Sequence, residues 1–155
     1  ISKETGLQRA SLYHRFPGGK EDMAKAVLER AWRWLDDHAL SPLTGPGKPE
    51  ARVKKMGKAL YTFFSGGKKN CLLDSLSFGA DDTVIKRHVH HGMKAWQDAL
   101  IAVARETGIS DKRARSQAQD VIIRIEGSLV MARVLKDYEP FERMISELPT
   151  VLLRK

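Results

Sequence analysis

The amino-acid sequence predicts an all-α protein in two parts, a short front part and a larger rear domain. Apolar residues recur at helical spacing over long segments, strand-type alternation is rare, and glycine and proline gather in a few breaks. Hydrophobic residues make up 42% of the 155 positions, which is enough to form a packed core. The pattern therefore favours packed helices over a sheet protein or a disordered chain.

The front part is predicted to contain two short helices and one long helix. Residues 1–5 are typical of a helix end, because Gly6 can take the left-handed conformation that stops a helix. A second short helix is expected over residues 8–15, before a break at residues 16–19 (FPGG). The third helix is expected over residues 20–38, where apolar side chains repeat at helical spacing.

The rear domain follows a linker rich in proline and glycine at residues 41–49, so we place the domains at 1–38 and 39–155. The last helix should be bent or interrupted near Pro149, because proline lacks a backbone N–H. Periodicity predicts the helices of this domain over residues 50–65, 72–79, 81–107, 111–137 and 140–153.

The net charge of +8 favours polyanionic partners such as nucleic acid or an acidic membrane surface. Much of the excess lies in residues 48–69, where seven lysines and arginines face only Glu50. We prefer to interpret this stretch as a solvated helix face, and the alternative is a surface that faces DNA or another anion. No apolar run is long enough to span a bilayer, and we expect no membrane partner.

Two short helices separated by a glycine turn suit a helix-turn-helix. Leu7 and Leu12 would pack inward, whereas the other side chains of the second helix would offer donors to base edges and phosphates. The run from Thr5 to Phe16, followed by GKEDM at residues 19–23, resembles the end of a TetR-family DNA-binding domain. The FPGGK variant resembles the subgroup around the lincomycin-resistance regulator. Weaker resemblance to the same subgroup extends through residues 126–129, 132–133, 148–149 and 152–153.

This resemblance implies a ligand-responsive transcriptional repressor in the bacterial cytoplasm, bound at the nucleoid when it holds its operator. It implies a homodimer that binds a palindromic double-stranded DNA operator and is released by a small hydrophobic or cationic inducer. Family members carry a first helix and a complete second helix before the motif, so we expect a truncated helix-turn-helix here. The positions that match the family's DNA contacts are Gln8, Arg9, Ala10, Ser11, Tyr13, His14 and Lys20.

Among these, Gln8 and Arg9 are expected to contact bases, since glutamine pairs with adenine and arginine with guanine. Tyr13, His14 and Lys20 match positions that contact phosphates, Lys20 from the amino end of a helix. From the residues alone, Tyr13 and His14 are equally well explained as amphipathic packing residues.

The resemblance also assigns a ligand cavity and a dimer interface to the rear domain. Aromatic residues gather between Trp32 and Trp96, and most of them should form core. The candidate cavity residues are Phe63, Phe64, Phe78, Met93, Trp96, Leu100, Ile122 and Glu126. Glu126 is either exposed, paired with Arg124 or Arg133, or aimed into the cavity; we prefer the first two. The candidate dimer residues, from the last two helices, are Ile125, Leu129, Ala132, Phe141, Met144, Ile145 and Leu148.

Other chemistry finds little support in the sequence. His88 and His91 fall on one helical face, but a metal site needs three or four ligands, so we expect surface histidines and no metal. Cys71 is expected to be buried, and a single cysteine fits a reducing compartment. No catalytic pattern is found, so we expect no enzyme and no cofactor. The alternative to a repressor is a helical small-molecule-binding protein without DNA-binding activity.

Overall fold

The structure is a computed structural model, and it describes residues 6, 8–72 and 83–155 of the chain. Within these ranges the regular elements are helices, which confirms the predicted all-α class, and no helix there is long and apolar enough to cross a membrane. The segments predicted at residues 1–5 and 73–79 lie outside the described residues. The elements are α2 (Arg9–Arg15), α3 (Lys20–Leu35), the π-helix η1 (Asp36–Leu40), α4 (Ser41–Thr44), α5 (Pro49–Phe63), α7 (Thr83–Arg105), α8 (Asp111–Leu135) and α9 (Glu139–Leu153).

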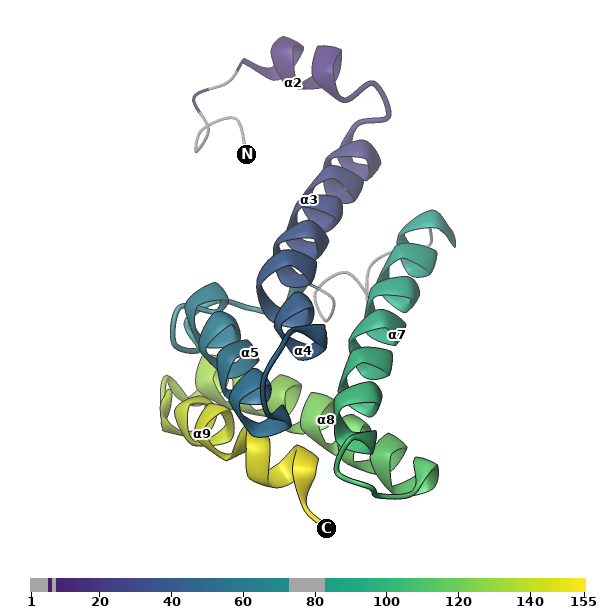
Figure 1. Cartoon of the computed structure of the whole chain (residues 1–155). Coiled ribbons are helices and arrows are strands. Elements are labelled where there is room, and N and C mark those ends of the chain that lie inside the picture. Colours follow the sequence, from purple (N-terminus) through teal and green to yellow (C-terminus); the bar gives the residue numbers. More distant parts are fainter. Residues whose placement is uncertain (1–5, 7, 73–82) are drawn as a thin grey trace.

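A single helical rod joins the two parts of the molecule. α3 passes directly into η1 and then into α4, and α2 stands at the far end of this rod (Figure 1). The prediction of a linker at residues 41–49 is therefore wrong for its first half, since helix extends to Thr44. Leu40, Pro42 and Leu43 are all buried there. Burial of these side chains in the core thus outweighs the tendency of Pro42 to end a helix.

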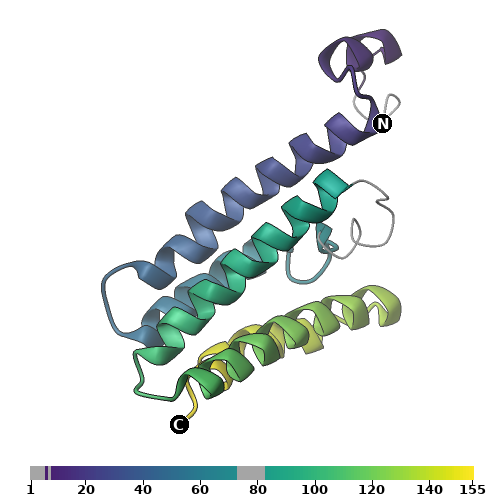
Figure 2. The ribbon, with the colours of Figure 1, turned by 90° about the vertical axis from the view of Figure 1, so that its right-hand side faces the viewer.

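The core is built by α5, α7, α8 and α9 together with the second half of α3. Figure 2 shows α3 and α7 running side by side, with α8 and α9 packed as a pair beneath them. Leu28 and Leu35 of α3 join the same buried cluster as Leu60 of α5 and Leu100 of α7. Full burial of one such side chain contributes about 1.5–3 kcal/mol. The rod is therefore part of the rear domain's core and not a tether to it.

Two glycines allow unusually close helix contacts. At Gly92 of α7, a Cβ atom would lie 1.6 Å from the ring of Trp32, so the indole rests directly on the backbone of α7. At Gly57 of α5, a Cβ atom would lie 3.0 Å from Leu148 and 3.5 Å from the carbonyl oxygen of Ile145 in α9. These contacts fix α3 on α7 and α5 on α9.

α9 continues through Pro149 to Leu153 and is not interrupted there, contrary to one form of the prediction. Pro149 has no N–H, so the Ile145 carbonyl lacks its usual helical donor. That carbonyl lies against Gly57, and Pro149 itself is buried. The packing of α5 against this turn accounts for a helix that continues past its proline.

The turn between α7 and α8 is held by polar contacts. The Ser110 side chain accepts the backbone N–H of Arg113 at 3.4 Å, which caps α8. Arg105 pairs with Asp111, and its hydrogen bond lowers the pKa of that carboxyl below the usual value. A charged Asp111 in the first turn also complements the positive end of α8.

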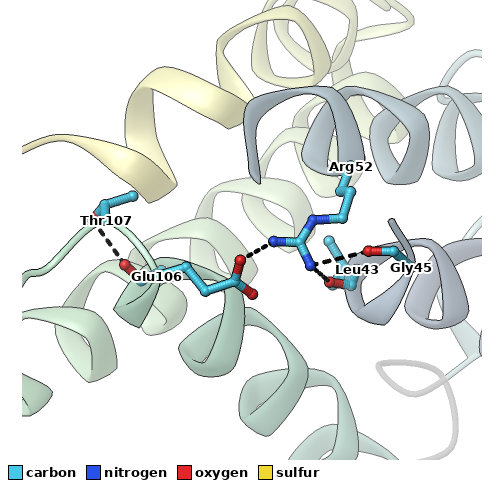
Figure 3. A network of polar contacts seen from close by, with 6 residues as sticks. Leu43, Gly45, Arg52, Glu106 and Thr107 are labelled. Atoms are coloured by element: carbon cyan, nitrogen blue, oxygen red, sulfur yellow. Dashed lines mark hydrogen bonds and ion pairs between the residues drawn. The ribbon is translucent and has the colours of Figure 1, made fainter. Parts of the chain in front are cut away.

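A buried arginine ties three segments together (Figure 3). Arg52 of α5, whose side chain is 8% exposed, donates to the carbonyl oxygens of Leu43 at 2.7 Å and of Gly45 at 3.3 Å. The same guanidinium pairs with Glu106 after α7. The sequence interpretation of residues 48–69 as a solvated face is therefore wrong for Arg52, although Lys54, Lys55 and Lys58 are exposed.

Gly92→Ala should destabilise the protein, because the added methyl group would overlap the Trp32 ring. We expect the free energy of unfolding to fall by about 2 kcal/mol, a typical cost of overpacking. Trp32→Leu should remove the overlap, so the double variant should lose less than the sum of the two single losses. Denaturant unfolding of the four proteins measures this coupling, and strictly additive losses would contradict the contact.

Arg52→Met should cost more stability than Glu106→Gln. The first change leaves two backbone carbonyls and a carboxylate without their donor, for which we expect a loss of about 3 kcal/mol. The second should cost about 1 kcal/mol or less, because the Glu106 side chain is 47% exposed and water replaces its partner. Urea unfolding of both variants gives the order, and equal losses would show that the carbonyl contacts contribute little.

Candidate functional site

α2 presents one anchored side and one free side. Leu12 is buried and is the anchor of this short helix. Gln8 precedes the helix in an extended conformation and makes no side-chain cap, so its amide is exposed and available to a ligand. Arg15 at the other end is exposed as well. A helix of seven residues held at one point leaves most of its surface to a partner.

The structure brings the residues predicted to contact DNA onto this free side and the turn that follows. Tyr13, the largest of them, is 47% exposed. Arg9 opens α2, but its side chain lies outside the described part of the structure. The remaining predicted residues are all exposed, and they are Gln8, Ala10, Ser11, His14 and Lys20.

The turn at residues 16–19 is shaped by two glycines. Gly19 has φ of +68°, a conformation that L side chains rarely adopt, and it is the N-cap of α3. The backbone N–H of Gly18 donates to the Asp22 carboxylate at 2.7 Å, where a Cβ on Gly18 would collide with that carboxylate. Asp22 thus closes the start of α3 from the third helical position, in the manner of a capping box. The sequence analysis did not identify this contact.

This turn sets the direction of the free N–H groups of α3. Lys20 is the first helical residue and is exposed beside them. A helix start with a lysine at its first position suits a phosphate group. A Cβ on Gly19 would lie 3.4 Å from the Tyr13 ring, so the turn packs closely against α2. Tyr13 and Lys20 therefore lie near one another across the turn.

An open pocket lies farther along α3. It has a volume of about 700 Å³, and Val27, Ala31 and Trp34 line it from α3. These residues recur at helical spacing together with Arg30, so they share one face of α3, and this spacing was the signal that sequence reasoning did not use. The other lining residues come from the end of α5 and the segment after it, namely Thr62, Phe63, Lys69, Asn70 and Leu72.

A small apolar cavity of about 20 Å³ adjoins this pocket. Ala31, Phe63 and Leu72 line both spaces. The small cavity is also lined by Leu28, Trp32, Leu35, Phe64, Cys71 and Trp96, and Cys71 is buried as predicted. Its volume suffices for about one water-sized group.

The predicted pocket residues do not lie together: some line the two cavities, and others lie in the core or on α8. Phe63, Phe64 and Trp96 line the two spaces, whereas Leu100 is fully buried in the core. Met93 packs against that core, and Ile122 belongs to it. Glu126 is half-buried on α8, with one carboxylate oxygen fully covered. Phe78 lies outside the described residues.

The predicted dimer residues mostly face the interior of their own chain. Ile145 is half-buried, and the other six are buried where α8 and α9 pack together, namely Ile125, Leu129, Ala132, Phe141, Met144 and Leu148. These six have little surface left for a partner. The opposite face of α8 carries exposed Ile123, Val130, Met131, Val134 and Leu135, with Val134 at 67%. α8 is apolar on two sides, and periodicity alone does not say which side meets the chain's own core.

His88, His90 and His91 do not build a metal site with their described neighbours. In residues 6, 8–72 and 83–155 no group of three or more metal-ligating side chains is found. His90 and His91 are exposed on α7, as the sequence analysis expects, whereas His88 is half-buried.

Comparisons with known proteins agree with this architecture. The chain is 27% identical to HTH-type transcriptional regulator LmrA of Bacillus subtilis (strain 168), over 99% of this chain and 84% of that protein. It is 21% identical to the uncharacterized HTH-type transcriptional regulator YxaF of the same organism, over 100% and 83% of the two chains. The crystal structure of a TetR transcriptional regulator from Legionella pneumophila superposes with a TM-score of 0.83 at 21% identity, covering 97% of this chain and 82% of that one.

The family comparison assigns the rear domain directly. The sequence profile described as "Transcriptional regulator LmrA/YxaF-like, C-terminal domain" matches residues 51–147, which is more than half of the chain. This range holds most of α5, all of α7 and α8, and most of α9. The chain therefore belongs to the LmrA/YxaF-like group of TetR-type transcriptional regulators.

Proposed function

We propose that this regulator represses transcription as a homodimer, binds a palindromic operator through α2, and releases it when a small organic ligand enters the pocket beside α3. The observation that carries the proposal is the position of α3. Its first residue lies beside the exposed helix α2, and its second half forms both core and pocket wall. One continuous element thus reaches both the proposed DNA-reading helix and the pocket.

In this proposal α2 enters the major groove. Gln8 and Arg9 read base edges, while Tyr13, His14 and Lys20 hold phosphates and fix the orientation of the helix. Two copies related by a two-fold axis would place their reading helices in successive major grooves, about 34–36 Å apart. This spacing requires a dimer, since one α2 buries too little surface to specify an operator.

We place the dimer contact on the exposed apolar face of α8, defined by Ile123, Val130, Met131, Val134 and Leu135. Their relative exposures range from 39% to 67% within one chain. Their spacing gathers them along one side of the helix, next to Gly127, where an added Cβ atom would meet no other side chain within 4 Å. A symmetric pair of α8 helices would cover this face.

The coupling between ligand and operator follows from the packing of α3. A ligand between α3 and α5 would press on the α3 side chains that line the pocket, and Trp32 holds the same helix against α7 at Gly92. A shift of α3 moves α2 with it, so ligand and operator binding oppose each other reciprocally. The rival function, ligand binding without DNA binding, predicts no such opposition.

The assigned DNA contacts are tested by two variants of the operator-binding surface. Lys20→Ala should weaken binding to all sequences alike, because it removes one phosphate contact. The slope of the logarithm of the binding constant against the logarithm of the salt concentration should become shallower by about one. Arg9→Ala should relax base preference at one position by about 1–3 kcal/mol. Titration of a labelled palindrome from the upstream region at several salt concentrations gives both quantities.

Lys112→Ala is the matched control, since Lys112 is an exposed lysine at the start of α8. It should leave affinity and salt slope unchanged. If the Arg9 and Lys20 variants bind as the parent does, the contacts are wrongly assigned. If the parent itself shows no preference for any palindrome, the rival function is favoured.

Val134→Glu should convert the dimer to monomers, because it places a charge in the centre of an apolar contact. The side chain is 67% exposed in the single chain, so the fold of the protomer should be unaffected. Ala102→Glu, on an exposed position of α7, adds the same charge elsewhere and should leave the dimer intact. Sedimentation velocity distinguishes the two states, and a Val134→Glu dimer would refute this interface.

A further inference from the structure

We propose that the pocket between α3 and α5 takes a small aromatic organic anion, with Arg30 and Lys69 binding its acidic group. This inference rests on the proposed ligand-responsive function and names the chemistry of its ligand. The pocket volume of about 700 Å³ lies in the range of small-molecule sites. It therefore accommodates a molecule of one to three fused rings.

The charges at the pocket have one sign among the described residues. Of the described residues that line it, Arg30 and Lys69 are the charged ones, and they come from different elements. Neither forms an ion pair with an acidic residue in the part of the chain that the structure describes. Two cations that converge on one open pocket attract an anion, and the arginine offers a planar fork that fits a carboxylate.

The walls favour a flat ring. Trp34 stacks on Phe63 with ring centroids 4.7 Å apart and on His38 with centroids 4.6 Å apart. Phe63 in turn meets Phe64 edge to face. These contacts hold the aromatic side chains in place before a ligand arrives, so little ordering is needed on binding. Asn70 and Thr62 add polar groups at the same pocket.

Aromatic walls also attract cations, and the sequence analysis expected a hydrophobic or cationic ligand. The structure favours the opposite charge. A cation here would approach a guanidinium and an ammonium, and repulsion between full charges exceeds the attraction of a ring face. An anion gains from both Arg30 and Lys69 and still stacks on the rings.

The small cavity beside the pocket has further donors in its walls. Trp32 and Trp96 line the small cavity next to it, and the indole N–H of each is buried without an acceptor among the described residues. Buried donors are usually paired, so a ligand oxygen or a water beside these indoles would satisfy them. An anion that also carries a carbonyl or hydroxyl oxygen fits both ends of the site.

The experiment compares three ligands with the same ring system and different charge. Calorimetry measures binding of 2-naphthoate, 2-naphthalenemethanol and 2-naphthylmethylammonium to the intact dimer. We expect 2-naphthoate to bind at least tenfold more tightly than the ammonium compound and to lose affinity as salt rises. Arg30→Gln and Lys69→Gln should each weaken 2-naphthoate about tenfold and leave the neutral alcohol unchanged.

Lys68→Gln is the matched control, because Lys68 is the neighbouring exposed lysine but does not line this pocket. It should bind 2-naphthoate as the parent does. Tighter binding of the ammonium compound, absence of binding by all three, or equal effects of Lys68→Gln and Lys69→Gln would each overturn the proposed ligand chemistry.

Operator binding without ligand separates this proposal from the function on which it rests. Arg30→Gln and Lys69→Gln should bind the operator as the parent does, because neither residue belongs to the DNA surface. If the parent binds a palindrome but 2-naphthoate fails, only the ligand chemistry is wrong. If the parent binds 2-naphthoate as expected but no palindrome, the repressor function is wrong and the anion site stands.

Discussion

The architecture depends on the contact between the Trp32 ring and the backbone of α7 at Gly92. Any side chain at Gly92 would overlap the indole, so this close approach fixes how α3 lies against α7. The position of α3 in turn decides where α2 stands and how wide the neighbouring pocket is. The core side chains of the same helix, Leu28 and Leu35, make this placement stable.

The same rod has two different sides, one packed in the core and one at the open pocket. Its buried side belongs to one continuous core, and an adjacent side supplies Arg30 and Trp34 to an open pocket. A packed core does not deform gradually, so under the proposed function a ligand in this pocket would shift the helix as a unit. The network around Arg52 holds the far end, where the rod meets α5 and α7. Any displacement of the rod should therefore be largest at the end that carries α2.

Hydrophobic periodicity and the glycine and proline breaks predicted the all-α fold, the approximate extent of the described helices and the exposed face of α2. They did not predict helix at residues 41–44, where burial of Leu43 outweighs a proline, or the Asp22 cap, which depends on the path of two glycines. The pocket was found only in part, because Arg30 and Lys69 come to line it through tertiary packing. The dimer face that we propose on α8 differs from the residues predicted for it, since periodicity does not show which apolar side of the helix packs on the chain's own core.

The π-helix η1 has a consequence for the evolution of this family. A π turn is equivalent to one extra residue inserted into an α-helix. Each residue turns an α-helix by about 100°, so losing one residue from this segment would rotate everything before it relative to everything after it. Insertions and deletions that are tolerated in surface loops would here change the orientation of α2 relative to the rear domain. Residues 36–40 should thus keep their length while their side chains vary.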